Sequence, residues 1–345
     1  MANIYDVARL ARVSTTTVSK VLSNTPYVSE KTKQRVLNAM HDLQYSPSLA
    51  ARGLTNNRTY VLGLIIPHDP DYSFRDPFLL EVIRGVESVA STNDYNVLLS
   101  MSKKSLHRAT YDRFLRTGYV DGVVTVETLQ GELDEQELAT SGIPRVSAGY
   151  REDLRNIDSV NCDDLQGGYE VTKHLLGLGH RRIGIISGPE NFIGATASRL
   201  QGASNALMEY GLMLDMSLVT YGDFSIESGF RAAEPLLQNE CRPTAIFAMN
   251  DRMALGAIGK ARELGLYVPN DLSVVGFDDI PLTSVIDPPL TTIRQFPAEM
   301  GKIATQHLFA MITNEIEHFE SVVIPIELVI RGSTAIPAHK DSAQR

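Results

Sequence analysis

Residues 14–24 read STTTVSKVLSN, and this stretch decides how the N-terminal part of the chain is interpreted. Three consecutive threonines form helix poorly, because a β-branched side chain loses rotational freedom there. The spacing of Val18, Val21 and Leu22 is nevertheless helical, and Ser14 is a suitable N-cap. The stretch therefore predicts a short helix, and the threonines in its first turn are expected to have a role other than stabilising that helix.

Two further helices flank this stretch. The preceding one has an apolar face made of Ile4, Val7, Ala8 and Leu10, and it ends at Arg12. The following one begins after Ser29, with an inward face made of Val36, Leu37, Met40 and Leu43. This order is typical of a helix-turn-helix, whose second helix enters the major groove N-terminus first. There each threonine offers a hydroxyl for a base edge or phosphate and a methyl for a thymine methyl. A small helical cap with a Thr-rich exposed turn is the alternative.

Charge is divided unevenly along the 345 residues. The formal net charge is −9, yet residues 1–60 carry eight Lys or Arg against three Asp or Glu. A small basic head on a large acidic body favours a head that meets a polyanion. A solvated basic face without a partner is the alternative. No apolar run approaches the roughly 20 residues that span a membrane, and the N-terminus lacks the apolar region of a secretory signal. Length and composition predict two or three domains and no membrane partner.

Signatures of enzyme, metal or cofactor chemistry are missing from the sequence. No dinucleotide fingerprint, Walker lysine or Gly-x-Ser-x-Gly turn occurs. His174 and His180 lack the neighbours of a metal site, so capping or solvent-facing roles are expected for them. Cys162 and Cys241 have neither metal-ligand nor disulfide-framework spacing, which predicts buried free thiols in a reducing cytosol. We therefore expect a protein that is not an enzyme and needs no metal or cofactor.

From residue 60 onward, short apolar runs alternate with helical patterns. Strands are expected at 60–67, 96–101, 121–126, 143–149, 181–187, 244–249 and 272–277, and helices at 78–92, 106–118, 165–178, 197–210, 226–237 and 252–264. This alternation predicts a parallel α/β fold. Two successive sets of about four strands indicate two similar lobes, with the chain crossing between them near residues 160 and 290.

Polar side chains follow two of the expected strands. Asn250 and Asp251 come after 244–249, Asp278 and Asp279 after 272–277, and Arg199 lies early in a helix. Open parallel sheets bind ligands at the carboxyl ends of their strands. An amide, a carboxylate and a guanidinium together suit a ligand with several hydroxyls. Capping of the following helices is the alternative role for Asp251 and Asp279.

The segments IYDVARLARVSTTTVSKVLSN (4–24) and VSEKTKQRVLNAMHDLQYSPSLAARGLTNNRT (28–59) resemble the head and hinge of the LacI/GalR family of bacterial transcriptional repressors. The resemblance implies an all-α helix-turn-helix head and an α/β body with two periplasmic-binding-protein-like lobes of parallel sheets flanked by helices. The implied domains are a head (1–46), a hinge helix or linker (47–59), a first lobe (60–161 and 291–320), a second lobe (162–290 and 321–335) and a disordered tail (336–345).

Within the head and hinge, the expected DNA contacts are Ser14, Thr15, Thr16, Thr17, Lys20, Asn24 and Leu54. Thr15, Thr16 and Lys20 match the base-reading positions of the family, and Leu54 matches its minor-groove leucine. Leu54 also stands among small and basic residues, and an apolar side chain wedged between base steps kinks DNA. Gly53 makes the hinge helix weak by about 1 kcal/mol relative to alanine, which favours a helix that forms on DNA.

Within the body, AMNDRMALGA (248–257) and SVVGFDDIPLTSVIDPPLTTIRQ (273–295) resemble the family's effector-site motifs. The expected effector contacts are Phe78, Tyr150, Arg199, Asn250, Asp278 and Gln295. Asn250 and Asp278 favour a sugar over a purine. Tyr150, which stands where many sugar-responsive relatives carry a charged pair, is expected to stack on a sugar ring, and residues 68–76 to line a wider pocket for an oligosaccharide.

The resemblance implies a cytoplasmic, nucleoid-associated homodimer that represses a carbohydrate-utilisation operon. It would bind a pseudo-palindromic operator in double-stranded DNA and be released by a mono- or oligosaccharide bound between the lobes. Repression controlled by a purine, a nucleoside or a corepressor is the alternative within the same fold. A sugar-binding transport protein would share the body but not the basic head.

Overall fold

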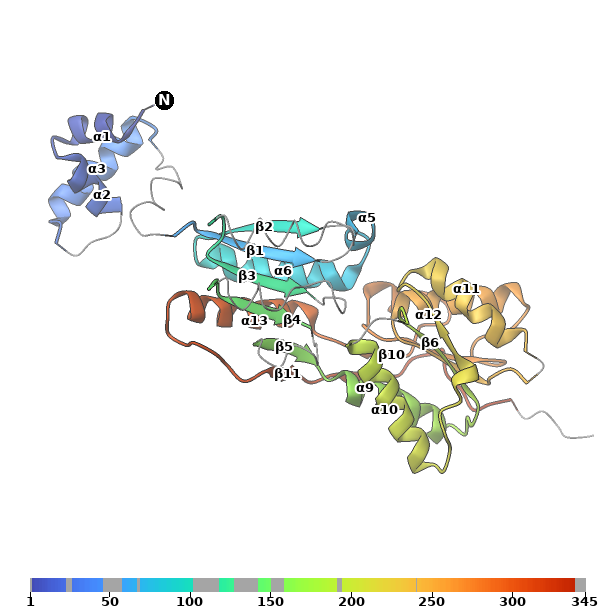
Figure 1. The fold of residues 1–345 in the computed structure, drawn as a ribbon. Coiled ribbons are helices and arrows are strands. Elements are labelled where there is room, and N and C mark those ends of the chain that lie inside the picture. Colours follow the sequence, from blue (N-terminus) through green and yellow to red (C-terminus); the bar gives the residue numbers. More distant parts are fainter. Residues whose placement is uncertain are drawn as a thin grey trace, which may run out of the picture. The chain divides into compact units, whose positions relative to one another are not determined.

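The computed structural model of the chain describes residues 2–22, 27–45, 58–66, 69–101, 118–126, 142–149, 158–190, 194–239 and 241–338. These residues fall into two units, one reaching Val61 and including Gly118–Asp121, the other containing the remainder (Figure 1). Within these ranges no helix is long and apolar enough to cross a membrane.

The first unit begins with a head of three helices, drawn in blue in Figure 1. They are α1 (Ile4–Ala11), α2 (Thr15–Leu22) and α3 (Glu30–Asp42). Val7, Val18 and Val36, one from each helix, are fully buried in a shared core. Leu10 and Leu37 were expected to face inward, but they are 50% and 42% exposed. The buried faces of α1 and α3 pass instead through nearby alanines, Ala11 and Ala39.

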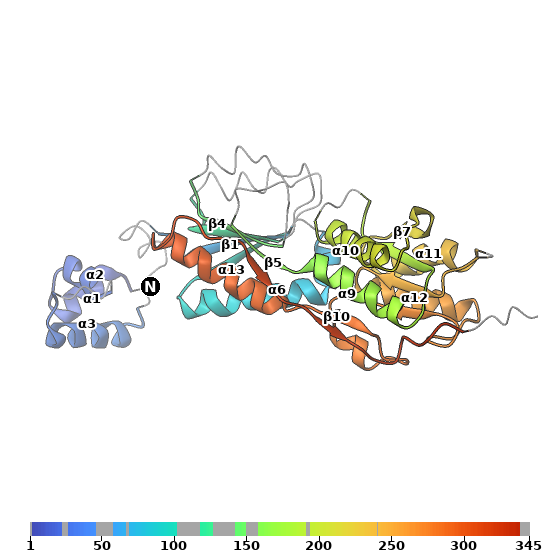
Figure 2. The same cartoon turned by 90° about the horizontal axis from the view of Figure 1, so that it is seen from below.

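The first lobe of the second unit is built on a six-stranded sheet in the order β11-β5-β4-β3-β1-β2. Its strands are β1 (Val61–Ile66), β2 (Asn96–Met101), β3 (Gly122–Val126), β4 (Arg145–Ala148), β5 (Ser159–Cys162) and β11 (Val322–Ile324). Pairing is parallel from β1 through β3, β4 and β5 to β11. The helices are α5 (Pro70–Ser73), α6 (Pro77–Thr92) and α13 (Pro297–Ile312), and α6 and α13 pack together against the sheet (Figure 2).

The second lobe has a four-stranded parallel sheet in the order β7-β6-β8-β9. Its strands are β6 (Ile183–Ser187), β7 (Val219–Tyr221), β8 (Ala245–Ala248) and β9 (Ser273–Val275). Its helices are α9 (Asp164–Gly177), α10 (Ala195–Glu209), α11 (Ile226–Leu237) and α12 (Asp251–Glu263), with short turns η2 (Met216–Leu218) and η3 (Pro281–Ser284). α9 packs on α10 and α11 on α12, so both lobes are α/β layers around a buried parallel sheet, as expected.

A small antiparallel sheet pairs β10 (Thr292–Arg294) with β12 (Glu327–Val329). One expected boundary differs here, because 321–335 was assigned wholly to the second lobe. β11, inside that segment, pairs with β5 and covers the edge that β5 would otherwise leave open. The return to the second lobe therefore comes after Ile324. The helix expected at 106–118 lies almost wholly outside the described residues.

Glycines let three helix pairs approach at backbone distance. They are Gly85 and Gly301 between α6 and α13, Gly168 and Gly202 between α9 and α10, and Gly229 and Gly256 between α11 and α12. A Cβ added at any of these six would lie 2.0–2.3 Å from a backbone oxygen of the facing helix. This spacing fixes α10, which carries Arg199, against α9, and α12, which Asn250 caps, against α11.

Candidate functional site: a reading helix and an inter-lobe cavity

The N-terminus of α2 is capped by its own hydroxyls. The Ser14 Oγ accepts from the Thr17 backbone N–H at 3.1 Å and lies 2.9 Å from the Thr17 Oγ1. The Thr17 hydroxyl is therefore used in the cap, whereas the Thr16 and Lys20 side chains are exposed and Thr15 is half-buried. Asn24 and Leu54 lie outside the described residues, and their DNA contacts stay predictions.

A cavity of about 50 Å³ opens between the two lobes. It is lined by Tyr72, Asp76, Phe78, Leu79, Ala195, Arg199, Phe224, Asn250, Asp278 and Gln295. The structure thus brings together five of the six expected effector residues, which come from α6, α10 and the loops after β8, β9 and β10. The sixth, Tyr150, lies outside the described residues.

Asp278 and Gln295 form a hydrogen-bonded pair in the wall of the cavity. The Gln295 Nε2 donates to the Asp278 Oδ1 at 2.6 Å, and Asp278 has a positive φ of 123° that turns it out of the sheet. Burial, together with the charges of Asp251 and Asp76, raises the pKa of Asp278 well above its usual range. Burial thus makes the Asp278 carboxylate costly to ionise, and a hydroxyl or amine donor from a ligand would stabilise its ionised form.

Asn250 is the N-cap of α12, a role considered for Asp251. Its Oδ1 accepts from the Met253 N–H at 2.9 Å, and its Nδ2 donates to the Phe224 carbonyl at 3.1 Å. A primary amide has two donor hydrogens and two acceptor lone pairs, so half of its bonding capacity is left for a ligand.

Arg199 is held by the second lobe itself. Its Nε donates to the Asp164 Oδ1 at 2.8 Å, its Nη1 to the Met249 carbonyl, and its guanidinium lies 3.7 Å from the centroid of the Phe277 ring. The Arg199 and Asp164 side chains are only 7% and 8% exposed. A buried, paired guanidinium shapes the cavity but is not an open receptor for an anionic group.

Tyr72, Asp76 and Phe224 also line the cavity, although none was named as a site residue. The Asp76 Oδ1 caps α6 through the Phe78 N–H at 2.9 Å, and its Oδ2 accepts from the Tyr72 hydroxyl at 2.7 Å. Asp76-Pro77 is a sequence signal for a helix start, which masked its place in a site. Residues 68–76 were expected to line the pocket, and Tyr72 and Asp76 of this segment do.

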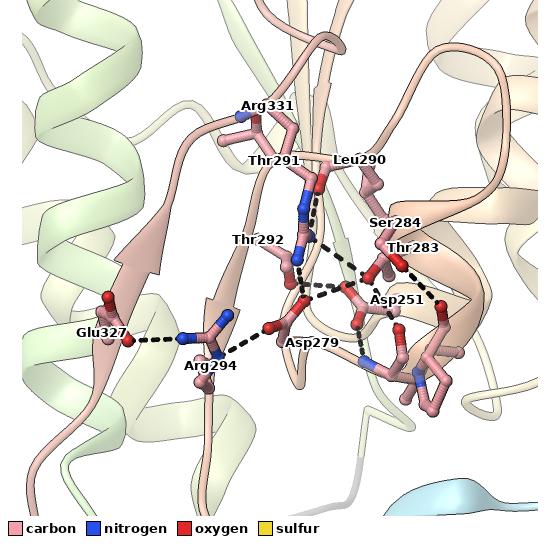
Figure 3. A network of polar contacts seen from close by, with 12 residues as sticks. Asp251, Asp279, Thr283, Ser284, Leu290, Thr291, Thr292, Arg294, Glu327 and Arg331 are labelled. Atoms are coloured by element: carbon pink, nitrogen blue, oxygen red, sulfur yellow. Dashed lines mark hydrogen bonds and ion pairs between the residues drawn. The ribbon is translucent and has the colours of Figure 1, made fainter.

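A polar network surrounds Asp251 and Asp279, which follow the cavity residues Asn250 and Asp278 in the sequence (Figure 3). Asp279 accepts from the Arg331 Nη2 at 2.6 Å and the Arg294 Nε at 2.8 Å, so it is ion-paired and does not cap a helix. Although burial opposes ionisation, hydrogen bonds from Arg331 and Arg294 lower the pKa of Asp279. Arg294 also bonds Glu327 across β10 and β12 at 2.8 Å. The network thereby ties the loop after β9, which lines the cavity through Asp278, to strands β10 and β12.

Asp251 fastens α12 to the same network. Its Oδ1 accepts from the Thr292 hydroxyl at 2.5 Å, and its Oδ2 accepts from the Ile280 N–H at 2.9 Å. Burial raises the pKa of Asp251 to about 7.

Two expectations about isolated polar residues were wrong. His180 is 1% exposed and lies 2.8 Å from the Thr244 hydroxyl, so it is a core residue and not a solvent-facing one. Cys162 is buried as expected, whereas Cys241 is exposed. Among the described residues no group of three or more His, Cys, Asp or Glu is placed to hold a metal ion.

A three-helix head and a two-lobed α/β body with a polar inter-lobe cavity define a DNA-binding regulator that responds to a small ligand. The profile described as "Bacterial regulatory proteins, lacI family" matches residues 3–48, and "Periplasmic binding protein-like domain" matches residues 172–334. The chain is 38% identical to the HTH-type transcriptional regulator DegA of Bacillus subtilis (strain 168) over 338 residues, which cover 96% of this chain and 98% of DegA.

Other relatives also match this chain over almost the whole length of both proteins. The ribose operon repressor of Haemophilus influenzae is 36% identical, with 96% of this chain and 98% of that protein covered. The lac repressor dimer bound to operator and the anti-inducer ONPF superimposes with a TM-score of 0.83 at 28% identity, covering 97% of this chain and 99% of that one. The chain belongs to the LacI family of bacterial transcriptional regulators. It is a LacI-family transcriptional repressor, and this family is not one of enzymes.

Proposed function

We propose that this repressor binds a pseudo-palindromic operator as a cytoplasmic homodimer and is released by an uncharged sugar held between the lobes. The observation that carries the effector assignment is the cavity that joins Asp278, Gln295 and Asn250 to Tyr72 and Phe78. Amide and carboxylate groups make paired hydrogen bonds with vicinal hydroxyls, and aromatic faces cover the apolar face of a sugar ring.

The charges around the cavity support an uncharged ligand. Arg199 is already paired with Asp164, and among the described residues Asp278 forms no ion pair. A phosphorylated ligand would bring further negative charge beside Asp278 and Asp76 in a buried site, where like charges repel strongly. Among the similar solved structures, one is a complex of the transcriptional regulator CelR with cellobiose, an uncharged disaccharide.

A purine or nucleoside is the second candidate, favoured by Phe224. Its half-buried ring lines the cavity with Tyr72 and Phe78, and such faces also stack on a planar base.

A thermal-shift panel of neutral mono- and disaccharides, purines, nucleosides and their phosphate esters distinguishes these candidates. At a concentration of about 100 times its Kd, a true effector stabilises the protein by about 2.7 kcal/mol, which is readily seen as a rise in Tm. We expect neutral sugars to raise the Tm and their phosphates not to. Stabilisation by purines alone would move the assignment to the second candidate, and stabilisation by phosphates alone would contradict the charge argument.

For the head, Thr16→Ala is expected to change the preference among operator variants by roughly 1 kcal/mol or more, because Thr16 is exposed at the start of α2 and its hydroxyl and methyl would touch bases in the proposed complex. The salt dependence of binding should stay unchanged, since threonine carries no charge to displace counterions.

The matched variant is Lys20→Ala, which removes one positive charge. It should reduce the slope of log operator affinity against log salt concentration by about one. Fluorescence anisotropy with an operator series at several salt concentrations measures both quantities. A Thr16→Ala protein with unaltered preference would remove this residue from base reading.

A further inference from the structure

One buried ion pair crosses from lobe to lobe. Asp76, before α6, belongs to the first lobe, and Arg252, in the first turn of α12, belongs to the second. The Arg252 Nη1 lies 3.3 Å from the Asp76 Oδ2, and the guanidinium lies 5.2 Å from the centroid of the Tyr72 ring. The Arg252 side chain thus touches two residues of the opposite lobe.

The pair is largely withdrawn from water. The Arg252 and Asp76 side chains are 12% and 9% exposed, compared with 39% and 46% for Arg182 and Asp215, an ion pair within the second lobe. When the lobes are together both charges are desolvated, so removing one partner leaves the other buried without a counterion, which costs far more than in an exposed pair. The arrangement in which the lobes are together therefore depends on both Asp76 and Arg252.

The contact also defines one wall of the effector cavity. Asp76 and Tyr72 line the cavity, and the same Asp76 oxygen accepts from both the Tyr72 hydroxyl and Arg252. Arg252 lies two residues from Asn250, which lines the opposite wall. If the lobes part, Asp76 loses its cation and the two walls move apart together.

We propose that Arg252 is a positioning residue that latches the second lobe onto Asp76 and Tyr72 and so holds the effector cavity closed. The contact between the lobes does not depend on what the effector is. Its consequence rests on the proposed function, because an effector bound between the lobes and the Arg252 contact would favour the same closed state. A ligand that needs both walls then binds tightly only when Arg252 is engaged.

The latch is tested without any effector, by measuring the distance between the lobes in the full-length protein. Spin labels are attached to cysteines at exposed positions in each lobe, Gln306→Cys on α13 and Gln238→Cys after α11, in a Cys241→Ser background. Labelled chains are diluted with unlabelled chains so that distances within one chain dominate double electron–electron resonance.

Arg252→Met is expected to lower the ratio of short to long inter-lobe distances at least about tenfold, because a buried carboxylate loses its partner. Asp76→Asn, which keeps an oxygen to cap α6, should shift the distribution in the same direction, and Arg252→Lys should restore part of the short-distance population. Arg182→Met, the control, should leave the distribution unchanged.

The double variant Arg252→Met/Asp76→Asn should be no more open than the more open single variant, since the two residues act as one unit. Unchanged distances in both single variants, or an equal shift in the control, would overturn the latch. Neither result would bear on whether the effector is a sugar, which the ligand panel decides separately.

Discussion

Gly168→Ala is expected to destabilise the body by about 3 kcal/mol, although Gly→Ala within a helix normally stabilises by about 1 kcal/mol. A Cβ on Gly168 would lie 2.0 Å from the Arg199 carbonyl oxygen and 2.7 Å from the Arg199 Cα. These are backbone atoms of α10, so a side-chain rotation does not relieve the clash, and the two helices must move apart. The clash falls on the residue whose guanidinium shapes the effector cavity.

The control for this prediction lies in the same helix. A Cβ on Gly177, the last residue of α9, would meet nothing within 4 Å. Gly177→Ala should therefore be neutral or slightly stabilising. Urea unfolding followed by circular dichroism compares the two, and the midpoint should fall only for Gly168→Ala. Equal midpoints for both variants would show that α9 and α10 are not packed as tightly as the structure places them.

Asp278→Asn is expected to weaken effector binding, so that the response needs more effector, while operator binding is retained. The substitution keeps an oxygen that can accept from Gln295, and asparagine has nearly the same shape as aspartate. It removes the desolvated carboxylate, and a hydrogen bond to a charged group contributes about 1.5–3 kcal/mol. Effector affinity should therefore fall roughly 10- to 100-fold.

Glu227→Gln, an exposed carboxylate in the first turn of α11, is the matched control. Isothermal titration with the sugar found in the panel gives the affinity, and anisotropy with labelled operator gives DNA binding. In the wild type, effector affinity should also fall with acidification, because protonation of Asp278 at its raised pKa removes an acceptor. Asp278→Asn should lack that dependence. Normal affinity in this variant would place the effector elsewhere.

The central strands of both lobes could be predicted from the sequence because they are continuous apolar runs, such as residues 61–66 and 245–248. β5, β7, β10, β11 and β12 were not predicted, because each has only three or four residues, and all except β11 include polar ones. α13 was also missed, although Pro297 marks its start, since it follows the expected crossing between the lobes. Short edge and crossing elements are specified by tertiary pairing and not by their own pattern.

The cavity residues that directly follow strands could be predicted from the sequence. Asn250 and Asp278 stand at the carboxyl ends of β8 and β9, and the parallel fold alone brings them together. Asp76 and Arg252 carried no such signal, because they belong to different lobes and each resembles an ordinary helix-start residue. Their partnership depends on how the lobes close, which local sequence does not encode.

The most direct test of this mechanism is the operator affinity of the full-length protein with and without saturating amounts of the sugar that stabilises it. We expect the sugar to weaken operator binding at least about fivefold, and operator to weaken sugar binding by the same factor. Asp278→Asn should need roughly 10- to 100-fold more sugar to reach the same effect on operator binding. Operator affinity that is unchanged when the wild-type cavity is saturated would contradict the claim that this cavity controls DNA binding.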